Sequence, residues 1–365
     1  MRALLQAILP DTLRAALLPA ALFAAAFAGV AIPLSLAFRA QTPMPDMIVF
    51  TPKLEAYRAT AADYDTVFIG TSRTFYHIVP EEVEAGAALA GCPGWRVINL
   101  GVFGLTGYEQ DWLTGEVLKA GDGKLQRVII EDPLPNTHKL ADATTDRARY
   151  FHGPEMWPAH MASIASYPES LPKRVFRAGM FVIGAGFDLS GVGRGSDLMF
   201  PPAEAPRPSQ FDMSERGFEA LGSTTTPDIL ARRAEFENDP AGFDAYLARY
   251  GAPSNEDTAQ RASYLADRLD RLSAAGETSA LYISPDLPEL DRTPRTGEAV
   301  RALPGNRIVL NFNRPDVYPD LFERDLWYDF SHFGEAGARA LSRLTGEELC
   351  AATGASTAVT ADAVR

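Results

Sequence analysis

Two short segments, far apart in the sequence, contain the side chains best suited to chemistry. Ser72 follows an apolar run at residues 66–69 and stands just before a predicted helix. Asp329 and His332 lie close together, immediately before the last predicted helix. A carboxylate can orient an imidazole, which then takes the proton of a serine hydroxyl that attacks an acyl carbon. These residues predict a Ser-His-Asp triad; the alternatives are a serine that caps a helix and a structural histidine paired with an acid.

The elements that must position these residues alternate between strand and helix. Short apolar runs predict buried strands at residues 66–69, 96–100, 127–130, 280–283 and 307–310. Helical patterns follow them, starting at residue 80 and covering residues 108–119, 265–272 and 334–349. This alternation predicts an α/β fold with a parallel sheet. Residues 137–255 interrupt the alternation with short helical pieces, at 227–236 and 241–250, and are expected to form an insertion or lid.

The two chemical segments together resemble the SGNH/GDSL hydrolase family. In that family the nucleophile follows the first strand, and an Asp-x-x-His motif lies near the C-terminus. Ser72 matches the nucleophile within Gly-Thr-Ser-Arg, and Asp329 and His332 match the last block. The resemblance covers residues 64–136 and 278–349. It implies a flavodoxin-like, three-layer α/β/α fold and the activity of an esterase, a lipase, or a carbohydrate O-acyl hydrolase or transferase.

A second family block resembles residues 98–104, where an asparagine at a strand end is followed by glycines. The resemblance implies an oxyanion hole made by the backbone N–H groups of Ser72 and Gly104, with Gly101 as the alternative to Gly104. The family's third block, Gly-x-Asn-Asp, is replaced here by Glu-Asp-Pro-Leu-Pro-Asn. Asn136, the last residue of that stretch, is the candidate for the missing oxyanion amide.

Arg73 and several aromatic residues are candidates for substrate contact. Arg73 directly follows the candidate nucleophile and suits a carboxylate or phosphate, although a structural ion pair with a nearby acid is the preferred alternative. Trp327 precedes the Asp-x-x-His motif and suits stacking on a sugar face, although aromatic residues belong more often to the core. The same two interpretations apply to Trp112, Trp157, Tyr76 and Tyr328. Glu131 and Asp132 are interpreted as loop structure, because adjacent residues at a strand end point to opposite faces.

The N-terminus is predicted to be a separate segment. From Ala15 to Phe38 the chain is uncharged and long enough to span a bilayer as a helix; a cleaved signal and a buried core helix are the alternatives. Arg2 and Arg14 favour a cytoplasmic N-terminus, which places the rest of the chain on the periplasmic or extracytoplasmic side of the inner (plasma) membrane. The expected domains are an anchor at 1–40, a tether at 41–62, an SGNH-like domain at 63–352 and a flexible tail at 353–365.

An anchored domain of this kind is similar to the membrane-tethered branch of the family, which includes DltD-like and exopolysaccharide O-acyl-transfer proteins. The resemblance implies an acyl-ester or carbohydrate substrate, contact with the lipid bilayer, a membrane acyl-donor protein as a partner, and no cofactor. The expected function is that of a serine esterase or O-acyltransferase acting on a cell-envelope or exported polysaccharide. The alternative is a non-catalytic envelope module that binds a glycan or partner proteins during polymer export.

The chain has only two cysteines, Cys92 and Cys350. In an oxidising compartment they are free to pair, and two separate buried thiols are the alternative. Cys92 precedes the second predicted strand, and Cys350 ends the last predicted helix. The first and last helices of a doubly wound sheet commonly cover the same face, so these ends are expected to come within disulfide distance.

Charge and ligand patterns exclude other classes of function. The net charge of −13 disfavours nucleic acid, whose binding needs clustered Lys and Arg. The histidines of the middle segment, His138, His152 and His160, have no metal-ligand spacing, and no cysteine or carboxylate cluster completes a zinc site. We therefore expect no metal and no nucleic-acid partner.

Overall fold

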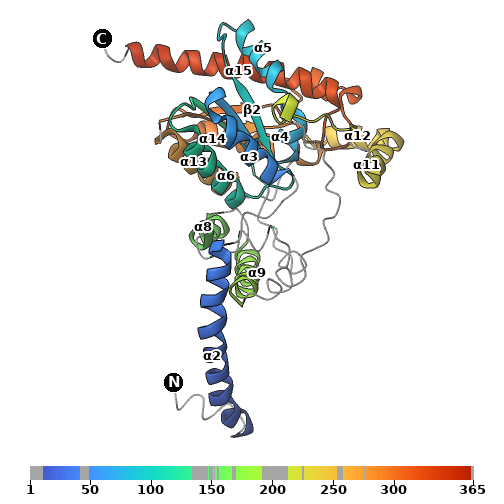
Figure 1. Cartoon of the computed structure of the whole chain (residues 1–365). Coiled ribbons are helices and arrows are strands. Elements are labelled where there is room, and N and C mark those ends of the chain that lie inside the picture. Colours follow the sequence, from blue (N-terminus) through green and yellow to red (C-terminus); the bar gives the residue numbers. More distant parts are fainter. Residues whose placement is uncertain are drawn as a thin grey trace. The chain divides into compact units, whose positions relative to one another are not determined.

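The computed structural model describes residues 11–41, 49–133, 147, 151, 153, 156–166, 170–190, 213–223, 226–252, 258–274 and 276–362. The chain forms two compact units. The larger unit comprises Asp46–Thr137, Ala159–Val175 and Pro208–Arg365, and it contains the sheet (Figure 1). The smaller unit comprises Met1–Pro45, His138–Pro158 and Phe176–Arg207.

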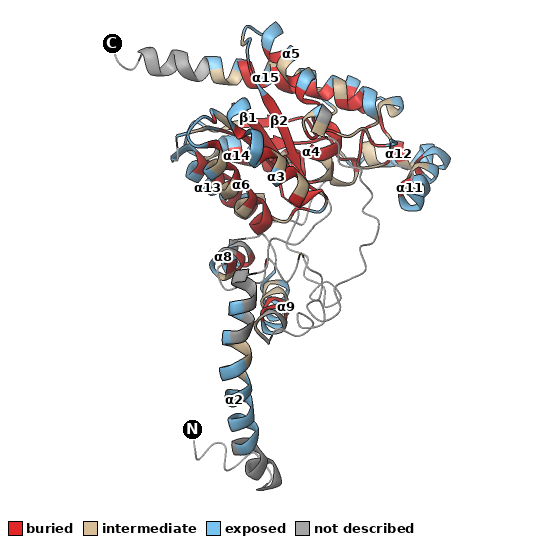
Figure 2. Ribbon diagram, in the orientation of Figure 1, coloured by how far each residue is buried: buried red, intermediate tan, exposed pale blue. Residues whose placement is uncertain are grey.

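The larger unit is built on one parallel sheet. Its strands are β1 (Thr66–Gly70), β2 (Val97–Gly101), β3 (Arg127–Glu131), β4 (Thr278–Ile283) and β5 (Ile308–Asn311). They pair in the order β2-β1-β3-β4-β5, which is the order of doubly wound, flavodoxin-like sheets. All five are the strands that the apolar runs predict. The strands are almost wholly buried, as parallel strands covered on both faces must be (Figure 2).

Helices cover both faces of this sheet and confirm the α/β class. On one face, α5 packs against α15, and the opposite face carries α3, α6, α13 and α14 (Figure 1). The bounds of these helices are α3 (Phe50–Thr60), α5 (Pro80–Leu89), α6 (Gly107–Gly121), α13 (Thr258–Ala274), α14 (Thr293–Ala302) and α15 (Glu335–Asp362). A short helix, α4 (Ser72–His77), follows β1 directly. Single 3-10 turns occur at Ala61–Asp63, Met213–Glu215, Leu287–Glu289, Pro319–Phe322 and Arg324–Leu326.

Part of the expected tether belongs to the folded body instead. Residues 50–60 form α3, whose Phe50, Leu54 and Tyr57 are buried in one stripe at helical spacing. Lys53 on the same helix is also buried, and its Nζ donates to the carbonyl of Gly101 at the end of β2, at 2.7 Å. The body therefore begins near residue 49, because the apolar spacing of α3 gives it a face to bury.

The expected flexible tail is also partly helical. Helix α15 continues past residue 352 as far as Asp362. Alanine is the strongest helix former, and Ala355, Ala358 and Ala361 favour this continuation. The flexibility of the tail from residue 353 stays a prediction.

The segment between β3 and β4 carries the predicted helical insertion. Its helices are α8 (Trp157–Ser166), α9 (Leu171–Ser190), α11 (Pro227–Asn238) and α12 (Pro240–Leu247). The last two match the helical pieces expected at 227–236 and 241–250. Proline at the first position and a capping side chain, Thr226 for α11 and Asp239 for α12, explain where these helices begin.

The predicted N-terminal span lies within one helix, α2 (Asp11–Gln41), which contains Pro19 and Pro33. Among the described residues, no helix is both long and apolar enough to cross a membrane. The membrane anchor therefore stays a prediction.

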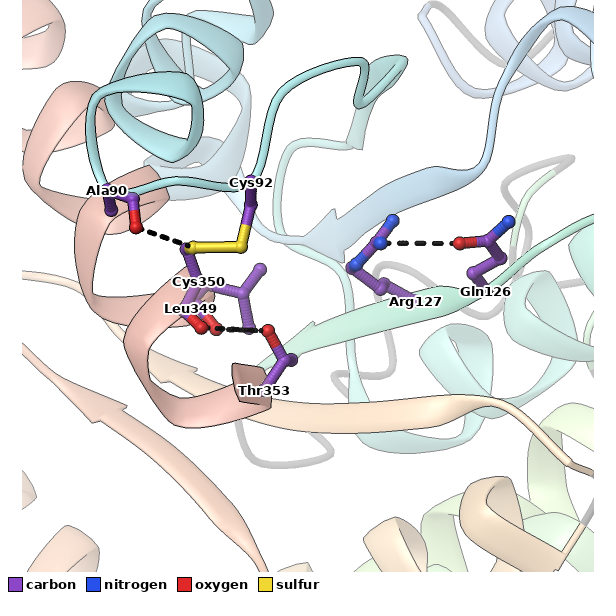
Figure 3. The surroundings of a disulfide bond; sticks show 7 residues. All are labelled: Ala90, Cys92, Gln126, Arg127, Leu349, Cys350 and Thr353. Atoms are coloured by element: carbon purple, nitrogen blue, oxygen red, sulfur yellow. Dashed lines mark hydrogen bonds between the residues drawn. A yellow bond between two sulfur atoms is a disulfide. The ribbon is translucent and has the colours of Figure 1, made fainter. Parts of the chain in front are cut away.

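The structure joins Cys92 and Cys350 in a disulfide, as expected from the sequence (Figure 3). Their Cα atoms are 5.9 Å apart, and the bond links the loop after α5 to α15 across a sequence separation of 258. The pairing follows from the packing of α5 against α15 on one face of the sheet.

This disulfide gives a testable expectation for stability. A crosslink across so long a loop restricts the unfolded chain, and the chain-entropy model assigns it about 5 kcal/mol. We expect the Cys92→Ser/Cys350→Ser double variant to lose several kcal/mol of unfolding free energy in urea denaturation. Reduction of the wild-type protein is the matched control, because it opens the same bond without a substitution. An unchanged unfolding midpoint in both would contradict the expectation.

Candidate active site

The candidate nucleophile stands where β1 passes into α4. Strand β1 ends at Gly70, Thr71 is the helix cap, and Ser72 is the first residue of α4. The Oγ of Ser72 lies 2.9 Å from Nε2 of His332. In sheets of this topology, ligands bind outside the carboxyl ends of the strands, near the point where the strand order reverses. Ser72 occupies such a position, beside the ends of β1 and β3.

The loop that carries Asp329 and His332 is held closed by its own hydrogen bonds. The N–H groups of Tyr328 and Asp329 donate to the carbonyl of His332, and Trp327 pairs with Phe333 in a short antiparallel bridge. Inside this turn, Oδ1 of Asp329 lies 2.9 Å from Nδ1 of His332. The same oxygen accepts the backbone N–H groups of Ser331 and His332, each at 2.8 Å. The carboxylate therefore fixes both the loop and the imidazole.

The charge state of Asp329 sets the roles of the two ring nitrogens. Burial raises the pKa of Asp329, but the hydrogen bond and charge of His332, the N–H of Ser331 and the charge of Arg232 together outweigh burial and hold the pKa below its ordinary value. Because the ionised carboxylate only accepts hydrogen bonds, the proton of the neutral ring belongs on Nδ1. Nε2 is then free to accept the proton of Ser72. The structure thus brings together the three residues of the predicted triad in the order that general-base catalysis requires.

Besides Ser72, the structure describes two of the candidate oxyanion-hole residues, Gly104 and Gly101, but not the third, Asn136. Gly104 is exposed in the loop between β2 and α6, with a φ of 60° that favours glycine. Gly101, the alternative, is explained by packing, because a Cβ there would lie 2.2 Å from the backbone nitrogen of Phe75 in α4. Asn136 lies outside the described residues. The role of Gly104 as the second oxyanion donor, together with Ser72, stays a prediction.

Glu131 at the end of β3 anchors the turn that presents Ser72. Its carboxylate accepts the N–H and hydroxyl of Thr71 at 2.7 and 2.8 Å, and the N–H and hydroxyl of Thr74 at 3.2 and 2.6 Å. Gly70 allows this approach, since a Cβ there would lie 2.4 Å from Oε2 of Glu131. Only 1% of Glu131 is exposed. The interpretation of this residue as plain loop structure was therefore wrong, and an acid that ends an apolar strand was the available signal.

Arg73 forms ion pairs inside the protein. Its Nε donates to Glu131 at 2.8 Å, and its Nη1 donates to Asp286 just after β4. Burial lowers the pKa of Arg73, but the charges of Glu131 and Asp286 outweigh burial and raise it, so the guanidinium stays charged. The expectation that Arg73 contacts the substrate was therefore wrong, because its guanidinium is bound by Glu131 and Asp286. The ion-pair alternative is the arrangement that the structure has.

Asn99, the asparagine of the second family block, binds the C-terminal end of α4. Asn99 is buried in β2, and its Nδ2 donates to the carbonyls of Thr74 and Ile78, each at 2.7 Å, and of Phe75 at 3.2 Å. These carbonyls lie at the C-terminal end of α4 and just after it, where helical N–H groups run out, and that of Thr74 also accepts the N–H of Ile78 at 3.1 Å. Asn99 therefore caps the short helix whose first residue is Ser72.

Trp327 belongs to the core and not to the substrate surface. It is 1% exposed, its Nε1 donates to the carbonyl of Leu321 at 3.0 Å, and its ring packs 4.6 Å from that of Phe333. The expectation that it stacks on a sugar is therefore wrong, because its whole ring is covered. Of the other aromatic candidates, Tyr76 contacts the triad, with its ring edge-on to His332 at 5.7 Å between centroids.

Comparison with protein-family models, with curated proteins and with solved structures found no match for this chain. The site therefore stands on its own geometry. No group of His, Cys, Asp and Glu able to hold a metal occurs within the described part of the chain. Of the middle histidines, His160 is buried against Tyr108, and His138 and His152 lie outside the described residues.

His77, at the end of α4, links the nucleophile helix to the loop of His332. Its Nδ1 lies 2.7 Å from the hydroxyl of Ser284, and its Nε2 accepts the backbone N–H of Phe333 at 2.9 Å. Because Nε2 must be unprotonated to accept, the linkage requires a neutral ring. Burial lowers the pKa of His77 well below 6.5, and the charges of His332 and Arg73 lower it further. Sequence reasoning did not single out this residue.

His77 predicts a loss of stability in mild acid. Below about pH 6.5 the unfolded chain takes up a proton at this position that the folded protein excludes, so the unfolding free energy falls by up to about 1.4 kcal/mol per pH unit. We expect His77→Asn, which keeps an amide donor near Ser284, to remove that contribution. Urea denaturation of both proteins at several pH values, within about one unit of the free histidine pKa of about 6.5, measures this contribution. If the unfolding free energies of the two proteins fall equally with pH, the expectation is contradicted.

Proposed function

We propose that this protein is an ester hydrolase or O-acyltransferase of the SGNH type, with Ser72 as its nucleophile. The observation that carries the proposal is the continuous chain from Ser72 Oγ to His332 Nε2 and from His332 Nδ1 to Asp329 Oδ1, with 2.9 Å at each step. Nucleophile, base and orienting acid within hydrogen-bond reach are the signature of covalent acyl transfer. The Ser72 position after β1 and the Asp-x-x-His loop before α15 agree with the family resemblance.

The reaction follows from this arrangement. As Ser72 Oγ attacks the carbonyl carbon of an ester, His332 Nε2 takes the hydroxyl proton, and Asp329 stabilises the imidazolium. The carbonyl oxygen becomes an oxyanion, for which the N–H groups of Ser72 and Gly104 are the proposed donors, each worth about 3 kcal/mol. His332 then gives its proton to the leaving alkoxide, which departs as an alcohol. Water or a sugar hydroxyl attacks the acyl-Ser72 ester, and the proton returns to Ser72 through His332.

We place the catalytic domain outside the cytoplasm. The disulfide between Cys92 and Cys350 supports an oxidising compartment, because such bonds are rare in the cytosol. The uncharged segment from Ala15 to Phe38 supports attachment to the inner membrane. The proposed substrate is an acyl ester of a cell-envelope or exported polysaccharide, and a membrane acyl-donor protein is the proposed partner.

The proposal is tested by following the acyl group. The purified protein is incubated with 4-nitrophenyl acetate and with an acetylated polysaccharide, each with and without an unacetylated glycan as acceptor. Acetate release indicates hydrolysis, and acetylation of the added glycan indicates transfer. Binding of the glycan without turnover of any ester would contradict the proposal and favour the non-catalytic envelope module.

A further inference from the structure

Helix α11, an element of the insertion, packs directly on the loop that carries Asp329 and His332. The ring of Phe236 on α11 lies 5.1 Å from that of Phe330 and 6.0 Å from that of Phe243. Phe243, on α12, in turn contacts Trp327 at 6.3 Å between ring centroids. An apolar contact therefore joins the insertion to the triad loop.

Hydrogen bonds across this contact run in both directions. Arg233 on α11 donates through Nη1 to the carbonyls of Trp327 and Tyr328, at 2.9 and 3.1 Å. Arg324, which precedes the triad loop, donates back to the carbonyls of Phe236 and Glu237, at 2.6 and 3.2 Å. The carbonyls of Phe236 and Glu237 lie at the C-terminal end of α11, where the last carbonyls of a helix lack helical partners. The position of α11 relative to the loop is thus fixed at both ends of the contact.

Arg232, the neighbour of Arg233, contacts the triad itself. Its Nη1 donates to Oδ2 of Asp329 at 3.2 Å. Oδ1 of that carboxylate already accepts the two backbone N–H groups of the loop and lies 2.9 Å from Nδ1 of His332. Oδ2 lies 3.1 Å from the same ring nitrogen. Arg232 therefore donates to the carboxylate oxygen that accepts no backbone N–H of the loop.

Other charged and titratable groups surround this pair on every side. Asp228, one turn earlier on α11, lies 3.5 Å from Nε of Arg232 but is largely exposed. Tyr76 on α4 faces both Asp329 and Arg232, and burial raises its pKa, so it stays neutral. His77 and Asp286 face the imidazole of His332 from α4 and from the end of β4. Arg232 is the cation that these contacts place against the carboxylate of Asp329.

We propose that Arg232 is a positioning residue of the triad, supplied by the insertion, which fixes the carboxylate of Asp329 against His332. The inference rests on the proposed function. The guanidinium acts in two ways: its N–H holds Oδ2 in place, and its charge partly offsets the charge with which Asp329 stabilises the imidazolium. The first effect raises turnover, and the second acts on how the reaction depends on pH.

The structure suggests variants that separate these two effects. Arg232→Lys keeps the charge but loses the planar fork, whereas Arg232→Gln loses the charge and, because its side chain is shorter, also the hydrogen bond to Oδ2 of Asp329. Arg233→Gln is the matched control, because it removes two hydrogen bonds between the same helix and the same loop without touching Asp329. The readouts are kcat and KM for 4-nitrophenyl acetate, and the rate of labelling by a fluorophosphonate probe across pH.

We expect Arg232→Gln to lower kcat by about 10- to 100-fold with little change in KM. Losses of that size are typical when a residue that orients a metal ligand by a hydrogen bond is replaced, and Arg232 orients Asp329 in the same manner. In this variant the fall of the labelling rate at low pH, the acid limb of the profile, should move to higher pH, because a positive charge beside the Asp329–His332 pair is gone. Arg232→Lys should retain the wild-type limb and recover part of kcat. Arg233→Gln should lower stability while leaving the limb in place.

The outcomes distinguish this inference from the proposed function. If the wild-type protein reacts with the probe and Arg232→Gln has the wild-type profile and kcat, the positioning role is refuted. If Arg233→Gln moves the acid limb as far as Arg232→Gln, the shift is caused by a change in how α11 packs on the loop, and the specific role of Arg232 is refuted. If the wild-type protein itself does not react with the probe, the proposed function fails first.

Discussion

Ser72→Ala and His332→Ala should each reduce kcat for ester turnover by several orders of magnitude, on the order of 10⁴- to 10⁶-fold. The reason is that Ser72 supplies the attacking oxygen and that His332, 2.9 Å away, removes its proton. The double variant should be scarcely worse than either single one, since members of a triad act as a unit. Steady-state kinetics with an aryl ester measure all three variants.

A nearby hydroxyl provides the control for this series. Ser331 lies on the same loop as His332, and its backbone N–H donates to Asp329 in any variant that keeps the loop. Ser331→Ala should therefore change kcat by less than about 10-fold, since its hydroxyl bonds to Asp286 and is not part of the chain from Ser72 through His332 to Asp329. Losses that simply multiply in the Ser72→Ala/His332→Ala double variant would argue against a shared mechanism.

Glu131→Gln should have the largest effect on stability among single substitutions at the site. Glu131 accepts hydrogen bonds from Thr71 and Thr74 and pairs with Arg73, all in a buried position. Loss of one partner from a buried ion pair costs about 3–5 kcal/mol when the remaining charge has no other partner, and because Arg73 keeps Asp286 we expect a loss at the lower end of that range. The Thr71 turn is then free to shift, so turnover should fall as well. Urea denaturation measures the first effect and ester kinetics the second.

A less buried acid, Glu82, whose side chain is 18% exposed, is the matched control for Glu131→Gln. Glu82 pairs with Arg343 on α15 at 2.7 Å, and that arginine is more than half exposed. Exposed pairs contribute about 0–1 kcal/mol, so Glu82→Gln should leave stability nearly unchanged. If Glu131→Gln is as mild as Glu82→Gln, the turn before Ser72 does not depend on this carboxylate.

Features set by local sequence could be predicted well. The five strands are continuous apolar runs, and the triad residues sit at the strand and helix ends that the pattern marks, so both follow from short segments. The disulfide between Cys92 and Cys350 could be predicted because the sheet topology places the first and last helices on one face. In each case a rule of local pattern or of topology was sufficient.

Features set by contacts between distant segments could not be predicted in the same way. Arg73 meets Asp286 across 213 positions of sequence, and Arg232 meets Asp329 across 97, and no spacing rule indicates either pair. Trp327 has the composition of a stacking residue, and only its packing against Phe333 makes it core. Helix α3 lies within the expected tether, and its one proline, Pro52, stands in the first turn, where a helix tolerates it; only the burial of Phe50, Leu54 and Tyr57 shows that the segment belongs to the body.

Covalent capture of the nucleophile tests the central claim most directly. The protein is treated with a fluorophosphonate, digested, and mapped by mass spectrometry. The account predicts one phosphonylated residue, Ser72, with labelling abolished in Ser72→Ala and strongly slowed in His332→Ala, because the hydroxyl reacts only when Nε2 takes its proton. An unlabelled Ser72 in folded wild-type protein, or a label that persists at the same rate in His332→Ala, would contradict it.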